Sequence, residues 1–266
     1  MTIESAERTA EIRNAGHRSL CRPFHGLLLL IFSITQHSSA GLFSTVRFAD
    51  VGLAITAFLS LTLVANAQVK ITLDHNTNAT ATSAFKFKNV PSPVKDDLAA
   101  RAKLLLLIGE IDPNGADLSA LTDGSLPTEE DQPSANFFFN AGTSGGRFRV
   151  DLGSVAEVAQ VNTYSWHPNT RGPQVYILYA SDGGDARFNA EPKGNIDPTT
   201  CGWKLIATVD TRPKQGEGGG QYGVSITDAS GSLGKYRHLL FDCVVTETDD
   251  DYGNTFYSEI DVVKKK

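Results

Sequence analysis

Residues 147–183 read RFRVDLGSVAEVAQVNTYSWHPNTRGPQVYILYASDG, and this stretch decides the fold class. In residues 147–152 apolar and polar side chains alternate, which is typical of a strand with one buried face. Gly153 interrupts that run, and residues 155–166 and 173–180 are two further runs rich in Val, Tyr and Ile. The turn-forming letters HPNTRG separate them. The pattern predicts three successive β-strands.

Further strand patterns lie on both sides of this stretch. The segments WKLIATVD, QYGVSIT, YRHLLFDCVV and FYSEIDVV follow it in the chain. Before it, residues 103–110 fit either a strand or the second half of a helix capped by Asp96. We favour the strand because the surrounding pattern is β. The total is about eight short strands, which predicts an all-β protein with a jelly-roll β-sandwich.

The first 67 residues have the features of an export signal. Residues 51–65 are uncharged and mostly apolar, and Ala65-Asn66-Ala67 is a small-x-small cleavage pattern. The apolar run is short for a membrane span, which needs about 20 residues. We therefore predict a signal peptide at 46–67, no stable membrane span, and a secreted or periplasmic product. We interpret residues 1–45 as a leader extension or as sequence before the true start.

The remaining 199 residues carry 19 Lys and Arg against 26 Asp and Glu, a net charge of −7. This acidic balance argues against nucleic acid as a partner, because cationic side chains supply most of the affinity for phosphates. Within this part we expect an N-terminal arm at 68–102, with short strands at VKITL and AFKFK, and one domain at 103–266. The loop-forming composition of residues 112–146 is typical of a functional or ion-stiffened loop.

Two cysteines, Cys201 and Cys243, remain after the leader. In an oxidising compartment they predict one disulfide, and the alternative is two separately buried thiols.

Catalytic patterns are missing from residues 68–266. His75, His167 and His238 are far apart and lack the spacing of metal ligands, and no Gly-x-Ser-x-Gly motif occurs. Residues 218–223 fit GxGxxG, but a strand pattern follows where a dinucleotide site requires a helix. We therefore predict a protein that is not an enzyme.

Several motifs together resemble one known family. In chain order they are DGSLPT, FRVDLG, YILYASDGG, Trp203, KYRHLLFDC and YSEIDVV, between about residues 120 and 263. This order is similar to the discoidin, or coagulation-factor type-C, domain of the galactose-binding-like superfamily. The chain departs from that family by an insertion between Gly183 and Trp203. The resemblance implies a jelly-roll sandwich that binds ligands through loops at one end.

Carbohydrate-binding members of that family often hold a structural calcium ion. The resemblance places its ligands at the side chains of Asp123, Thr128 and Glu259 and at backbone carbonyls, which are those of Ala120, Ser125, Thr128 and Ser258. Calcium prefers 6 to 8 hard oxygen ligands, and such a turn can supply several of them. An ordinary Asp-Gly turn and a solvated Glu259 remain the alternative.

The loop after residue 165 is the candidate binding site. Trp166, His167, Asn169 and Arg171 combine an aromatic face with polar donors, as sugar recognition requires. The alternative is that these side chains only hold the loop. Together these observations predict a secreted, non-catalytic module that binds a glycan with a structural Ca²⁺, or alternatively an adhesive domain that binds an extracellular protein.

Overall fold

The computed structural model describes residues 68–215, 218–246 and 254–266. The predicted signal peptide at 46–67 and the leader extension at 1–45 lie outside these residues. In the described ranges no helix is both long and apolar enough to cross a membrane.

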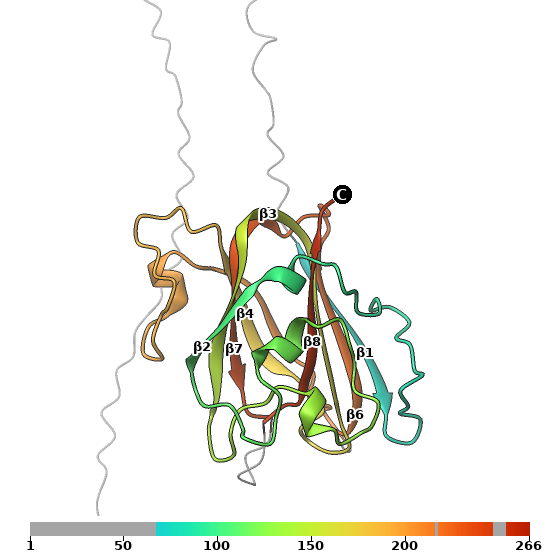
Figure 1. Cartoon of the computed structure of the whole chain (residues 1–266). Coiled ribbons are helices and arrows are strands. Elements are labelled where there is room, and N and C mark those ends of the chain that lie inside the picture. The colour runs from blue at the N-terminus through green and yellow to red at the C-terminus, as the bar shows by residue number, and fades with distance from the viewer. Residues whose placement is uncertain (1–67, 216–217, 247–253) are drawn as a thin grey trace, which may run out of the picture. The chain divides into compact units, whose positions relative to one another are not determined.

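Eight strands, all paired antiparallel, form the described part of the chain (Figure 1). They are β1 (Val69–Thr77), β2 (Lys103–Ile108), β3 (Gly145–His167), β4 (Val175–Ser181), β5 (Lys204–Asp210), β6 (Gly220–Asp228), β7 (Gly234–Val244) and β8 (Tyr257–Lys264). Short 3-10 helices connect them: η1 (Ala99–Arg101), η2 (Leu118–Thr122), η3 (Pro133–Ala135) and η4 (Pro198–Cys201). The prediction of an all-β sandwich is confirmed, and so is the strand in residues 103–110.

The long strand β3 belongs to both layers of the sandwich. Its first part pairs with β2 and β7, and its last part pairs with β6 and β8. β1 extends the β6 side, whereas β4 and β5 extend the β7 side. Figure 1 shows β1 and β6 on one side of the molecule and β2 and β7 on the other. The two layers are therefore joined through one continuous backbone.

Gly153 does not end the strand, which corrects the expectation of two separate runs. β3 continues through it, and the register against β7 shifts between Asp151 and Ala156. Gly153 has φ +80°, a conformation that glycine adopts without steric cost. Its N–H donates to the Asp151 carboxylate at 2.9 Å. The glycine thus forms an irregularity of the bulge type, which bends a strand without ending it.

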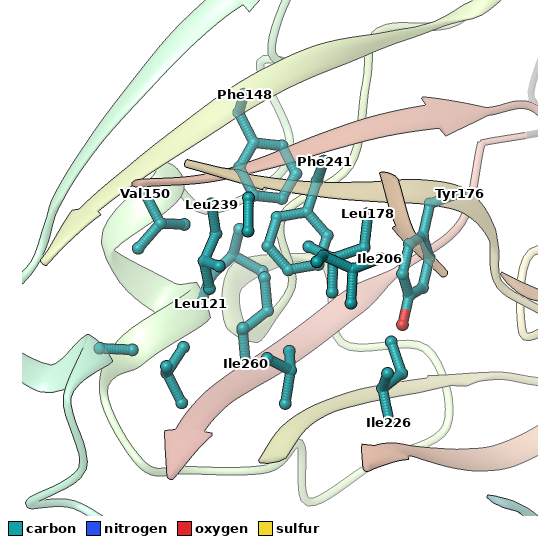
Figure 2. Close-up of a cluster of buried hydrophobic side chains, with 14 of the residues drawn as sticks. Leu121, Phe148, Val150, Tyr176, Leu178, Ile206, Ile226, Leu239, Phe241 and Ile260 are labelled. Carbon is teal, nitrogen blue, oxygen red and sulfur yellow. The ribbon is translucent and has the colours of Figure 1, made fainter. Parts of the chain in front are cut away.

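The core lies between the layers and is rich in aromatic rings (Figure 2). Phe148 of β3 and Phe241 of β7 are stacked with centroids 5.0 Å apart, and both are fully buried. Tyr176 of β4 and Tyr257 of β8 pack edge to face across the layers, with ring centroids 6.3 Å apart. Burial of this apolar surface is the main favourable contribution to the stability of the sandwich.

A second cluster lies on the outer face of the β7 side, where residues 182–203 cover Tyr179 and Leu240 and contribute Trp203. Arg147 of β3 fixes this insertion. Its guanidinium donates to three carbonyls of the insertion, the nearest that of Pro192 at 3.1 Å, and is paired with Asp242 at 2.6 Å. The insertion is therefore anchored to the two central strands of this side.

The predicted disulfide is wrong, because Cys201 and Cys243 are free thiols in the structure. Cys243 belongs to the core between the layers, whereas Cys201 packs against the outer cluster that contains Leu240. Side chains alternate along a strand, so Cys243 and Leu240 point to opposite faces of β7. The sheet itself separates the two sulfur atoms.

We expect Phe148→Ala to lower the free energy of unfolding by about 3–5 kcal/mol, because it leaves a cavity beside Phe241. Urea denaturation followed by tryptophan fluorescence measures this change. Val155→Ala is the control, since Val155 is 51% exposed, and it should cost less than about 0.5 kcal/mol. Equal losses in the two variants would contradict this description of the core.

Candidate functional site

The candidate site begins with a turn that follows η2. Asp123 accepts the N–H of Ser125 at 2.8 Å, and Gly124 has φ +71°. The N–H of Gly124 donates to Glu259 Oε2 at 2.9 Å. The structure thus brings the 123–125 turn against β8, although 135 residues separate Gly124 from Glu259 in the chain.

Glu259 is a buried carboxyl group, with only 1% of its surface exposed. Burial raises its pKa to about 9, and the nearby Asp261 and Asp123 add to this increase. No salt bridge to Glu259 occurs among the described residues. A buried carboxylate without a compensating charge is costly, so the ionised site favours a cation.

Two more carboxyl groups of this region bond to backbone amides. Asp261 accepts the N–H of Val94 at 3.2 Å and the hydroxyl of Tyr164 at 3.1 Å. Asp97 accepts the N–H of Val262, and burial raises the pKa of Asp97 to about 6. These bonds hold the chain before β2 against β8.

The other predicted calcium ligands lie around the same turn. Ala120 is part of η2, which packs against β8, and Ser258 precedes Glu259. The Thr128 hydroxyl donates to Gln132 Oε1 at 3.2 Å, and the Ser258 hydroxyl donates to Asn136 Oδ1 at 2.7 Å. In the described part of the chain, no three His, Cys, Asp or Glu side chains form a metal-binding group. An ion at this turn would therefore depend on carbonyl and hydroxyl oxygens as well as carboxylates.

A pocket of about 220 Å³ opens beside this turn. Its walls are formed by residues 83–93, the 124–128 turn, β3, β6 and Ser258 of β8. The lining side chains include Phe85, Lys86, Phe87, Thr128, Tyr164, Trp166, Gln221 and Ser258. The segment at 78–93, here named the pocket arm, follows β1 and is drawn in teal in Figure 1.

Aromatic rings form much of the pocket wall. Phe85 and Phe87 meet edge to face at 5.1 Å, and Phe87 lies 6.1 Å from Tyr164. Phe87 also covers Gly223 of β6, where an added Cβ would lie 3.1 Å from the phenyl ring. Glycine at this position lets the ring approach the sheet. Flat aromatic surfaces of this kind pack against the apolar faces of ligands.

Polar groups of β1 and β6 fix the pocket arm. The Asp74 carboxylate accepts the N–H groups of Asn89 and Val90, the second at 2.9 Å. Gln221 donates through Nε2 to the Thr82 carbonyl at 2.8 Å. Because these partners belong to paired strands, the position of the arm is tied to the sheet.

The structure separates the four predicted binding residues. Trp166 lines the pocket, whereas His167, Asn169 and Arg171 are not among its lining residues. His167 is 1% exposed and accepts the Asn169 N–H through Nδ1 at 3.2 Å. The Arg171 guanidinium lies 4.9 Å above the Phe256 ring. His167 and Arg171 therefore hold the loop against the segment before β8.

Sequence reasoning missed the pocket arm as part of the site. The letters AFKFK predicted a strand, but residues 84–88 are not in a strand. Their alternating pattern comes from Phe85 and Phe87, which pack in the pocket wall, whereas Lys86 and Lys88 are exposed. The alternation was a usable sign of one covered face, but it did not show which surface covers it.

Comparison with known proteins gives structural similarity only. No family model matches the chain, and no curated protein matches it. A Ruminococcus gnavus GH29 fucosidase in complex with fucose is 17% identical, with a TM-score of 0.40, over 65% of this chain. The chain spans 28% of the length of that fucosidase and 29% of a second GH29 structure.

Two smaller sugar-binding proteins are similar at the same level. A Streptococcus pneumoniae fucose-binding module is 12% identical, with a TM-score of 0.37, over 64% of this chain and 99% of its own. An F-lectin from the serum of Morone saxatilis, the striped bass, is 13% identical, with a TM-score of 0.41, over 66% of this chain and 50% of its own. These values are too low to identify the ligand of this chain.

We expect His167 to make stability depend on pH. Burial lowers its pKa to about 4, and the Arg171 charge adds to this, whereas Asp131 opposes it. The folded protein therefore favours the neutral ring. The contribution of His167 to folding stability is fully present above its unfolded pKa of about 6.5. As the pH falls from 6.5 toward 4, this contribution is lost, and the loss of stability reaches roughly 2 kcal/mol at about pH 5.

Urea midpoints of the wild type and His167→Gln at pH 8 and pH 5 test this expectation. The wild type should lose roughly 2 kcal/mol more than the variant over this interval, whereas other titrating groups affect both proteins alike. Identical pH dependence in the two proteins would show that His167 titrates normally.

Proposed function

We propose that this chain is a non-catalytic carbohydrate-binding module of the galactose-binding-like, discoidin type, and that the pocket beside the 124–128 turn is its binding site. The observation that carries the proposal is the pair of half-buried rings of Phe85 and Phe87 in the pocket wall, with the buried Tyr164 and Trp166 beside them. Sugar rings present apolar C–H faces and polar edges, and an aromatic wall with nearby hydroxyls complements both. Export, as the leader predicts, is part of this proposal.

The chemistry of the pocket supports binding without catalysis. Its lining residues include no His, Asp, Glu or Cys. Those are the side chains that most often act as general acids, bases or nucleophiles. Glu259 is bonded to the Gly124 N–H and is almost fully buried, so a ligand in the pocket does not meet its carboxyl group directly.

The proposal includes a structural calcium ion at the turn. Asp123 and Glu259 would hold it together with the hydroxyl of Thr128 and backbone carbonyls, which the resemblance places at Ala120, Ser125, Thr128 and Ser258. The buried Glu259 without a salt bridge supports this assignment. The ion would supply the positive charge that holds the turn against β8 and so shapes the adjacent wall of the pocket.

We expect Phe87→Ala to weaken glycan binding roughly 5- to 10-fold, because it removes an aromatic surface worth about 1 kcal/mol. A glycan array screen identifies a bound glycan, and titration calorimetry then measures its affinity. The control is Phe188→Ala, since Phe188 is similarly half-buried but packs against Trp203 away from the pocket. A flat array with calcium present would contradict the proposed function and favour the adhesive alternative.

We expect calcium to raise Tm, and Glu259→Gln to abolish the increase. Binding at about 100 times Kd stabilises a protein by about 2.7 kcal/mol, which raises the Tm of a domain this size by roughly 5–10 °C. Differential scanning fluorimetry with Ca²⁺, with Mg²⁺ and with chelator measures the shift. Glu157→Gln is the control, because Glu157 pairs with Lys265 at the surface. An equal calcium response in both variants would exclude Glu259 as a ligand.

A further inference from the structure

We propose that the ligand of this pocket is an anionic saccharide, one that carries a carboxylate or a sulfate group, and that Lys86 selects it. This inference rests on the proposed function and adds the class of sugar. It starts from the charge of the lining residues, in which Lys86 is the one charged side chain. The chain as a whole has a net charge of −6, so a cationic pocket wall is opposite to its overall balance.

Most of the uncharged polar groups in the pocket already donate within the protein. Gln221 uses both ends of its amide, donating to the Thr82 carbonyl and accepting from the Asn76 amide, each at 2.8 Å. Five lining hydroxyls donate to protein oxygens: those of Thr128, Tyr164, Ser165, Tyr222 and Ser258. These hydroxyl donors are used within the protein, and the donors left on these residues and on Trp166, whose indole N–H has no partner, are all neutral. A charged donor must come from elsewhere in the lining.

Lys86 is such a donor. Its side chain is exposed, and it forms no salt bridge to any described residue. An ammonium group offers three donors and no acceptor, so its best partner is an anion. A neutral sugar hydroxyl could accept one of these bonds, but a carboxylate or sulfate adds charge attraction.

Two more lysines lie near the pocket but outside its lining. Lys88 is exposed two residues further along the pocket arm, and the Lys95 side chain lies against Gly124 in the turn. Of the acids in this region, Asp74 accepts the N–H groups of Asn89 and Val90, whereas Asp123, Glu129 and Glu130 flank the 124–128 turn and are exposed. Among the lining residues an anionic ligand would therefore meet one lysine, Lys86, and no carboxylate.

A glycan array with matched pairs tests the inference on the full mature chain with calcium present. Each pair holds an acidic glycan and its neutral counterpart: oligogalacturonate and its methyl ester, sialylated and desialylated lactosamine, sulfated and unsulfated galactose. The pairs also distinguish carboxylate from sulfate. We expect the acidic member to bind roughly 2- to 5-fold more tightly, the scale of one ion pair at an exposed site. We expect Lys86→Gln to bind the acidic and the neutral member of each pair about equally.

Lys204→Gln is the matched control, because Lys204 is an exposed lysine of β5 and does not line the pocket. It should leave the preference unchanged. Equal binding of acidic and neutral members would overturn this inference and leave the proposed function standing. A preference that survives in Lys86→Gln would overturn the assignment to Lys86. If no glycan of either kind binds, the proposed function fails and the inference fails with it.

Discussion

The sharing of β3 between both layers is the constraint on which the rest of the structure depends. Each half of this strand pairs on both sides, so β2 and β7 are fixed relative to β6 and β8 through one backbone. The strand pairs with β7 on both sides of the irregularity at Gly153 and changes partners near Val158, which pairs with both β7 and β8. The buried rings of Phe148 and Phe241 then fill the space that this geometry leaves between the layers.

The candidate site is built from segments that are distant in the chain. The pocket arm follows β1, the 123–128 turn follows η2, and Glu259 belongs to the last strand. The sheet brings them together because β1 pairs with β6, and β6 and β8 flank the last part of β3. One carboxyl group, Glu259, faces the turn at a location where water is excluded. Fold and site are thus connected through the same strand pairs.

The residue patterns predicted where strands form better than they predicted which residues contact one another in the fold. The alternation in residues 147–152 and the runs after it gave strands because period-two burial is a local property. What could not be predicted depends on contacts across the fold. Cys201 and Cys243 lie on opposite sides of a sheet, and Phe87 needs the space at Gly223. Trp166 was recognised by its chemistry and does line the pocket, whereas the burial of His167 follows from the segment before β8.

The way in which the pocket arm is attached has a consequence for binding kinetics. β1 is held by a nine-residue ladder, whereas the arm after it is held by side-chain bonds, two of them exposed, and by the packing of Phe87 and Val90. Segments with few buried contacts open at a lower free energy than the whole domain. The apparent affinity of a pocket falls with the fraction of molecules in which its walls are in place. If the proposed site holds a ligand between the arm and the sheet, that ligand leaves no faster than the arm opens.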